Sequence, residues 1–319
     1  MEKIVELRNV SMFFRSRSGL LKSIVVKAVD GVSLYVGKAE TLALVGESGS
    51  GKTTVAKLSL RLLKPTGGRI IFEGVDITYT PEKELRWFRR KAQAVFQDPY
   101  SSINPYMTIR QIVEEPLILH KVEGDKVGIV EEALEAVRLI PAEEYLDKYP
   151  HMLSGGQRQR VGIARALVLK PIYIAADEPV SMIDASSRAE ILYLLRELQE
   201  KRGISFLYIT HDMATARHFS DRIAVMHLGK IVEIAESNDI VNNPLHPYTQ
   251  ALIEAVPDPN PANRFRERKT VSGEPLNPAN PPEGCRFHPR CPYVMDICRL
   301  NDPELKEIKK GHYVACHLY

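Results

Sequence analysis

No run of about 18 uncharged apolar residues occurs in the chain, so the sequence predicts no membrane-spanning helix. The opening residues, MEKIVE, alternate charged and apolar side chains and lack the apolar core of a secretory signal peptide. We therefore expect a protein that is made and kept in the cytosol. Any role at a membrane would have to come through a partner.

Charge of one sign is not in excess. The chain has 43 Lys and Arg residues against 40 Asp and Glu residues, which leaves a net charge of +3. A balance this small does not predict binding to nucleic acid through bulk electrostatics. We expect no nucleic-acid partner.

Cysteine is scarce, and all of it lies near the C-terminus. The four cysteines are Cys285, Cys291, Cys298 and Cys316. In a reducing compartment, such a cluster indicates a metal site rather than disulfides. Four thiolates suit tetrahedral zinc or the irons of a [4Fe–4S] cluster. Structural zinc sites usually contain closer cysteine pairs than these, and His288, His312 or His317 could replace one thiolate.

The remaining composition is globular, with 44% hydrophobic residues, and a length of 319 residues suggests about two domains. Strand patterns alternate with helical ones, which favours an α/β fold with a parallel sheet covered on both faces. Residues 99–165 have a helical pattern and are expected to form a helical subdomain within a first domain of residues 1–255. Residues 256–319 begin with a proline-rich linker and are expected to end in a small Cys-rich, metal-binding region. The expected strands cover residues 4–10, 24–29, 41–45, 172–176 and 205–210, and a helix is expected over 189–199.

Residues 46–53 match the phosphate-binding pattern G-x-x-x-x-G-K-[ST]. The pattern follows an apolar strand and precedes a helical stretch, residues 54–63, which is the context that it requires. Backbone N–H groups of such a loop surround a phosphate, and the helix N-terminus adds partial positive charge. Lys52 is expected to reach the β- and γ-phosphates, and the Thr53 hydroxyl to bind Mg²⁺. The nucleotide-binding residues predicted here are Gly46, Glu47, Ser48, Gly49, Ser50, Gly51, Lys52, Thr53 and Thr54.

Two further segments are expected to complete the site. Asp177 and Glu178 follow an apolar strand, whose carboxyl end is the edge where open α/β sheets bind ligands. Asp177 would hold Mg²⁺, and Glu178 would polarise the water that attacks the γ-phosphate. A second anion site is predicted at a capped helix start with two glycines, formed by Ser154, Gly155, Gly156 and Gln157.

These motifs, together with Gln97 and His211, occur in the order seen in ATP-binding-cassette (ABC) ATPases, and residues 1–255 resemble that family. The resemblance implies a P-loop NTPase (RecA-like) core with an antiparallel β subdomain and a helical insertion. It also implies ATP hydrolysis by a head-to-tail pair of subunits. Phe14, or its neighbour Phe13, resembles the aromatic residue that stacks on adenine. Gln97 resembles the glutamine that senses Mg²⁺ and water, and His211 the histidine that contacts the γ-phosphate.

The C-terminal half resembles one branch of this family. The His-Pro-Tyr segment at residues 246–248 is similar to that of oligopeptide and dipeptide importers, and the signature segment is similar to their "F" ATPase rather than the "D" one. The resemblance implies a heterodimer with a D-type ATPase, two transmembrane permease subunits and an extracellular substrate-binding protein. It places the chain on the cytoplasmic face of the membrane as a peripheral subunit. The surroundings of Cys285 and Cys291 resemble a cluster-bearing tail, which favours [4Fe–4S] with zinc as the alternative.

Other functions remain open at this point. Similar ATPases serve oligosaccharide importers, and cargo is selected by subunits other than this chain. A soluble cassette protein acting in DNA repair or translation is disfavoured, because the chain has one cassette and only a short helical insertion.

Overall fold

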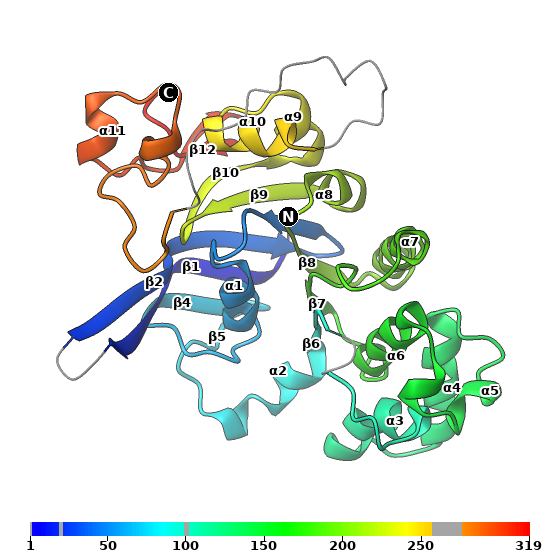
Figure 1. Cartoon of the computed structure of the whole chain (residues 1–319). Helices are drawn as coiled ribbons and strands as arrows, with labels where there is room; N and C mark the ends of the chain where they lie inside the picture. The colour runs from blue at the N-terminus through cyan, green and yellow to red at the C-terminus, as the bar shows by residue number, and fades with distance from the viewer. Residues whose placement is uncertain (1, 19–21, 99–101, 257–275) are drawn as a thin grey trace, which may run out of the picture.

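The structure, a computed structural model, describes residues 2–18, 22–98, 102–256 and 276–319. These residues form an eight-stranded sheet of order β11-β12-β10-β9-β3-β8-β7-β6 and a four-stranded sheet of order β2-β1-β4-β5. Helices α3 to α6 lie together on one side of the molecule, beyond β6 and β7 (Figure 1). Among the described helices, none has the length and apolar character needed to cross a bilayer.

The centre of the large sheet is parallel and completely buried. Every residue of β3, β7 and β8 is buried, and strands covered on both faces require consecutive apolar residues. The sequence therefore contains nearly continuous apolar runs at these strands. The predicted parallel α/β sheet is confirmed. The parallel strands are β3 (Thr41–Val45), β6 (Ala92–Val95), β7 (Tyr173–Asp177), β8 (Ser205–Thr210) and β9 (Arg222–His227), and β10 (Lys230–Glu236) runs antiparallel to β9.

Helices cover both faces of this sheet. Along β3, Leu42 and Leu44 point into one hydrophobic core, and Ala43 and Val45 into the other. The first core contains α1, and the second contains α7 and α8. The helices that flank the sheet or follow β10 are α1 (Lys52–Ser59), α7 (Ala185–Arg202), α8 (Met213–Phe219), α9 (Ser237–Asn242) and α10 (Pro247–Glu254).

The start and end of α1 differ from the prediction. The helix begins at Lys52, inside the phosphate-loop pattern, and ends at Ser59 rather than at residue 63. Arg61 has a φ of 53°, which no helical residue can adopt, and this explains the early end.

The smaller sheet is antiparallel throughout, as expected. β1 (Lys3–Ser18) and β2 (Lys22–Gly37) form a long hairpin that extends well beyond the predicted segments. β4 (Gly67–Phe72) pairs with β1, and β5 (Val75–Asp76) pairs with β4.

The helical region carries clear capping signals. The α3 and α6 helices each start with a capping box, at Thr108 and Ser154, and Asp125 caps α4. Its elements, with those that lead into it, are η1 (Glu82–Glu84), α2 (Arg86–Lys91), α3 (Ile109–Leu119), α4 (Lys126–Ala136), α5 (Glu143–Leu146), η2 (Pro150–Met152) and α6 (Gly155–Leu167).

The end of the chain returns to the large sheet, which the sequence analysis did not anticipate. The strand β12 (His312–Val314) pairs with β10, and β11 (Lys306–Lys309) pairs with β12. Between the linker and these strands lie η4 (His288–Arg290) and α11 (Asp296–Leu300). Most of the proline-rich linker, residues 257–275, lies outside the described residues.

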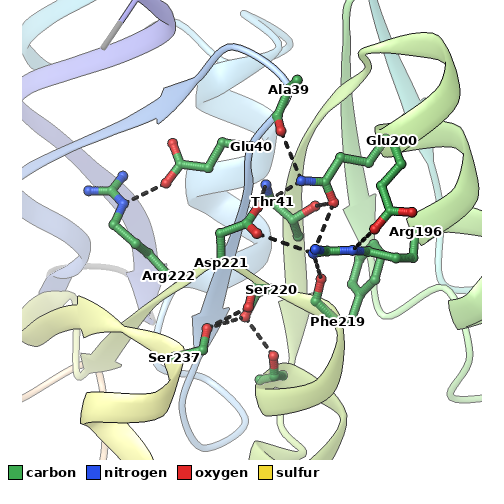
Figure 2. A network of polar contacts seen from close by, with 12 residues as sticks. Ala39, Glu40, Thr41, Arg196, Glu200, Phe219, Ser220, Asp221, Arg222 and Ser237 are labelled. Atoms are coloured by element: carbon green, nitrogen blue, oxygen red, sulfur yellow. Dashed lines mark hydrogen bonds and ion pairs between the residues drawn. The ribbon is translucent and has the colours of Figure 1, made fainter.

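A buried polar network fixes the amino-terminal end of β3 (Figure 2). The Thr41 hydroxyl donates to Gln199 of α7 at 2.9 Å, and the Gln199 amide donates to Asp221 at 2.7 Å. Glu40 and Arg222 form an ion pair at 2.5 Å. The network joins β3, α7 and the start of β9, so the loop at the opposite end of β3 leaves from a rigid strand.

Candidate functional site

The phosphate-loop pattern forms the connection between β3 and α1, and its glycines are required by close backbone contacts. A Cβ on Gly46 would lie 2.1 Å from the carbonyl oxygen of Met226, and a Cβ on Gly51 would lie 2.1 Å from that of Ala28. Neither distance leaves room for a side chain. Gly51 also caps α1 with a φ of 105°, so the loop turns directly into the helix N-terminus.

Lys52 lies buried at the centre of this loop. Its Nζ donates to the carbonyl oxygens of Gly46 at 2.7 Å and Glu47 at 2.8 Å. Burial lowers the pKa of the Lys52 ammonium, and the nearby carboxylates, chiefly Glu178 and Asp177, oppose that effect. The loop therefore holds a cation that an anionic ligand could satisfy better than two carbonyls do.

Thr53 and Asp177 provide oxygen ligands facing each other across this edge of the sheet. The Thr53 hydroxyl donates to Asp177 Oδ1 at 3.2 Å, and Asp177 is the last residue of β7. Burial raises the pKa of Asp177, while the hydrogen bond from Thr53 lowers it. A carboxylate and a hydroxyl in this arrangement fit a Mg²⁺ ion, which prefers hard oxygen ligands.

Glu178 is held from two sides by the other predicted site residues. Gln97 Nε2 donates to Glu178 Oε2 at 3.2 Å, and His211 Nδ1 lies 3.1 Å from Glu178 Oε1. Gln97 follows β6 and His211 follows β8, so three neighbouring strands converge on one carboxylate. The His211 side chain is 62% exposed and that of Glu178 is 18% exposed, so the group borders the solvent.

The remaining loop residues have different surroundings. Ser48 is exposed and Thr54 is half-buried. Ser50 Oγ is buried, and no described side chain or backbone group forms a hydrogen bond with it. Phe14 lies on β1 with 39% exposure, whereas Phe13 is half-buried beneath the Lys27 ammonium. Phe14 is therefore the more accessible of the two aromatic candidates.

The Ser154 segment lies at the start of α6, in the helical region, and α1 lies apart from it near the centre of the molecule (Figure 1). Ser154 accepts from the Gln157 N–H at 3.2 Å, and the Gln157 side chain accepts from the Ser154 N–H at 3.0 Å. A Cβ on Gly156 would lie 2.9 Å from Ser187 Oγ, so this glycine has a packing role against α7. Ser154 and Gly155 face outward enough to receive a ligand.

The four cysteines all belong to the small region after the linker, and all are free. Burial, with a smaller contribution from the other three cysteines, raises the pKa of the Cys285 thiol to about 11. In the described part of the chain, no group of three or more His, Cys, Asp or Glu side chains is arranged to hold a metal ion.

The three candidate histidines of this region have other partners. His288 and His317 each contact a backbone carbonyl, at 3.0 and 2.9 Å, and His312 Nε2 lies 2.7 Å from Glu233. Each of these contacts uses one ring nitrogen of the histidine.

Sequence reasoning missed two residues that contact the phosphate loop. Tyr248 and Arg290, both more than 200 positions away, hold Glu47. Tyr248 lies in the His-Pro-Tyr segment, which served only as a family marker. Arg290 lies beside Cys291, and no periodicity or spacing in the sequence connects it to the loop.

Two protein families match the chain. The family described as ABC transporter matches residues 29–181, and the family described as oligopeptide/dipeptide transporter, C-terminal region, matches residues 232–298. The oligopeptide transport ATP-binding protein AppF of Bacillus subtilis is 49% identical over 100% of this chain and 98% of its own length. A putative peptide import ATP-binding protein of Brucella ovis is 44% identical over 98% of this chain and 97% of its own length.

Solved cassettes share the fold. A dimeric, post-hydrolysis structure of the ATP-binding cassette MJ0796 with ADP and Pi is 30% identical, with a TM-score of 0.65 over 73% of this chain and 99% of that one. The structure of cbiO1 from Clostridium perfringens is 28% identical, with a TM-score of 0.66 over 76% of this chain and 92% of that one.

Proposed function

Because the chain belongs to the ATP-binding proteins of ABC transporters, in the branch with the oligopeptide/dipeptide C-terminal region, we propose that it hydrolyses ATP to drive peptide import. One observation carries the chemical part of this proposal. Glu178 is held between Gln97 and His211, on the same sheet edge as the phosphate loop and the Thr53–Asp177 pair. A phosphate-binding element and an oriented carboxylate are the two parts that hydrolysis of a nucleoside triphosphate requires.

The phosphate loop accounts for nucleotide binding. The Lys52 ammonium exchanges its two carbonyl partners for phosphate oxygens, and the backbone N–H groups at the start of α1 bind the same anion. Thr53 and Asp177 would hold Mg²⁺, which neutralises charge on the phosphates when bound. Phe14 would stack on the adenine.

Catalysis is mainly electrostatic positioning. The Glu178 carboxylate accepts a hydrogen bond from the attacking water and directs a lone pair of that water toward the γ-phosphorus. Gln97 and His211 fix the carboxylate in place, since each contacts a different oxygen. His211 is exposed enough to contact the γ-phosphate as well.

A second subunit would complete the site. Ser154, Gly155, Gly156 and Gln157 start α6 in the helical region, and in a head-to-tail pair they would bind the nucleotide held by the other subunit's loop. We propose a D-type ATPase as the partner, because the signature segment resembles the F type.

A groove beside the site suits the permease subunits. It has a volume of about 290 Å³, lies between β6, α3 and α6, and exposes the apolar side chains of Phe96 and Leu119. Gln97 immediately follows Phe96, so a subunit bound in this groove would be coupled to Glu178 through the hydrogen bond from Gln97. Two permeases and an extracellular binding protein would supply the cargo, and the chain would act at the cytoplasmic face of the membrane.

We also propose that the cysteines hold a [4Fe–4S] cluster, with zinc as the alternative. Structural zinc sites usually contain closer cysteine pairs than the spacings 285, 291, 298 and 316 provide. A cluster spreads its thiolates over several irons, and the other three cysteines lie close enough to Cys285 to raise its pKa. Its role would be to hold together a region too small for its own core. Iron, sulfide and zinc analysis of anaerobically purified protein tests this, and zinc without sulfide would refute the cluster.

The main proposal is tested on the complex isolated from native membranes. ATPase activity is measured with short peptides and with oligosaccharides, each presented with the cognate binding protein. Stimulation by peptides is the expected result. Stimulation by sugars alone would replace the cargo, and recovery without membrane subunits would point to a soluble cassette.

A further inference from the structure

Glu47, the second residue of the phosphate loop, is held by two residues from the C-terminal part of the chain. Its backbone N–H donates to Tyr248 Oη at 2.9 Å. Its two carboxylate oxygens accept from Arg290 Nη1 at 3.1 and 3.0 Å. A Cβ on Gly49 would also lie 3.5 Å from Pro278, so the chain that follows the linker passes beside the same loop.

The two residues that hold Glu47 are themselves rigidly anchored. Tyr248 is 1% exposed, and the Arg290 side chain is 10% exposed. The Phe287 ring packs against Tyr248 with 5.4 Å between centroids, and the Arg290 guanidinium lies 6.0 Å above the same ring. The His227 ring closes this cluster 4.4 Å from Tyr248. Side chains packed this tightly fix the position of the groups that they present.

Because Glu47 is negatively charged, its ion pair with Arg290 affects how the loop binds an anionic ligand. Its carboxylate belongs to the loop that surrounds the phosphates, where a free negative charge would repel them. The Lys52 ammonium also donates to the Glu47 carbonyl, so the backbone of Glu47 and the binding cation are directly linked. Arg290 neutralises the carboxylate and fixes its direction in one contact.

We infer that Arg290 and Tyr248 are positioning residues for the phosphate loop, so that the C-terminal region sets the affinity of the loop for nucleoside triphosphate. The inference rests on ATP binding at Lys52, as proposed above. These residues act on the loop through charge as well as through position. When Arg290 alone is replaced, the Glu47 carboxylate is left unpaired beside the phosphates. When Glu47 is replaced as well, that carboxylate is gone.

The test is a double-mutant cycle on the full-length chain. Dissociation constants for MgATP and MgADP are measured by calorimetry for the wild type, Arg290→Gln, Glu47→Gln and the double variant, with thermal unfolding recorded for each. Arg290→Gln is expected to weaken MgATP binding roughly 3- to 30-fold, the range found for residues that act on a site through contacts. Glu47→Gln is expected to weaken it less, and the double variant to regain most of the loss caused by Arg290→Gln.

Two further variants separate positioning from general docking of the C-terminal region. Tyr248→Phe keeps the packed ring and removes only the acceptor for the Glu47 N–H, so a smaller loss of affinity is expected. Asp302→Asn removes an ion pair between this region and β10, the 2.6 Å contact with Lys230, and touches no part of the loop. It is expected to leave the affinity for MgATP unchanged.

The outcomes are distinct. Equal MgATP affinity for the wild type and a stably folded Arg290→Gln variant would overturn the inference and leave the proposed function intact. The same conclusion follows if Asp302→Asn is as harmful as Arg290→Gln, or if adding Glu47→Gln deepens the loss. A wild-type chain that binds no MgATP would refute the proposed function and the inference together.

Discussion

Glu178 combines an unusual backbone conformation with a fully directed side chain. Its φ of 45° lies in the left-handed region, which costs a non-glycine residue on the order of 1–3 kcal/mol. The backbone is kept there by hydrogen bonds from its N–H to Ile209 at 2.9 Å and from the Ser181 hydroxyl to its carbonyl at 3.1 Å. Strain of this kind persists where surrounding contacts fix it, and here it directs the carboxylate toward Gln97 and His211.

The role of Glu178 can be tested by an isosteric change. Glu178→Gln keeps the size of the side chain and its contact with His211, so MgATP binding should persist. Turnover should fall by about 10²–10⁴, the usual effect of losing a general base. Phosphate release and MgATP affinity are measured together, with the exposed Glu254→Gln as the matched control. Near-normal phosphate release in Glu178→Gln would remove this residue from the role of base.

At the residue scale, the geometry of the phosphate loop was predictable because its motif fixes both residue type and spacing. The glycines at 46 and 51 and the lysine at 52 were predictable because the loop has no steric or electrostatic alternative at these positions. The contacts of Glu47 were not predictable. They depend on how the end of the chain docks on the cassette, and a docking over more than 200 positions leaves no local pattern.

At the scale of elements, buried parallel strands were predictable and the C-terminal strands were not. β3, β7 and β8 are apolar at nearly every position because both faces are covered. β11 is exposed along its whole length, so it has no apolar run to reveal it. β12 joins the sheet where Glu233 of β10 accepts from the N–H groups of Leu245 and His246 and contacts His312, a set of partners that only the fold brings together.

The turn into α10 predicts a pH dependence of stability. Burial, followed by the charge of His227, lowers the pKa of His246 from 6.5 to about 3. The unfolded state therefore binds a proton first as pH falls, and stability present above pH 6.5 is lost as pH drops toward 3. Between pH 6.5 and 5 the loss from this one group is on the order of 2 kcal/mol.

His246→Asn tests this prediction without removing the cap. His246 Nδ1 accepts from the Tyr248 N–H at 3.0 Å, and asparagine is a good N-cap that does not titrate. The free energy of unfolding, measured by denaturant at pH 7 and pH 5, should fall less on acidification in the variant than in the wild type. His218→Asn, at an exposed position, should behave as the wild type does. An unchanged pH dependence in His246→Asn would show that burial of this ring does not control the acid response.

At the scale of the whole molecule, the head-to-tail pair proposed above would place the phosphate loop and the Ser154 segment of one chain in different sites. Ser154→Arg is therefore expected to leave MgATP binding by the isolated chain within about twofold of the wild type, because its own loop is untouched. ATPase activity of the assembled complex should fall by about 10² or more, the scale of losing a preorganised donor at the transferred phosphate. Lys52→Ala is expected to abolish MgATP binding by the isolated chain. Asn238→Arg, at an exposed position of α9, controls for the added charge. If Ser154→Arg weakens MgATP binding by the isolated chain as strongly as Lys52→Ala does, Ser154 serves the chain's own loop and the head-to-tail arrangement fails.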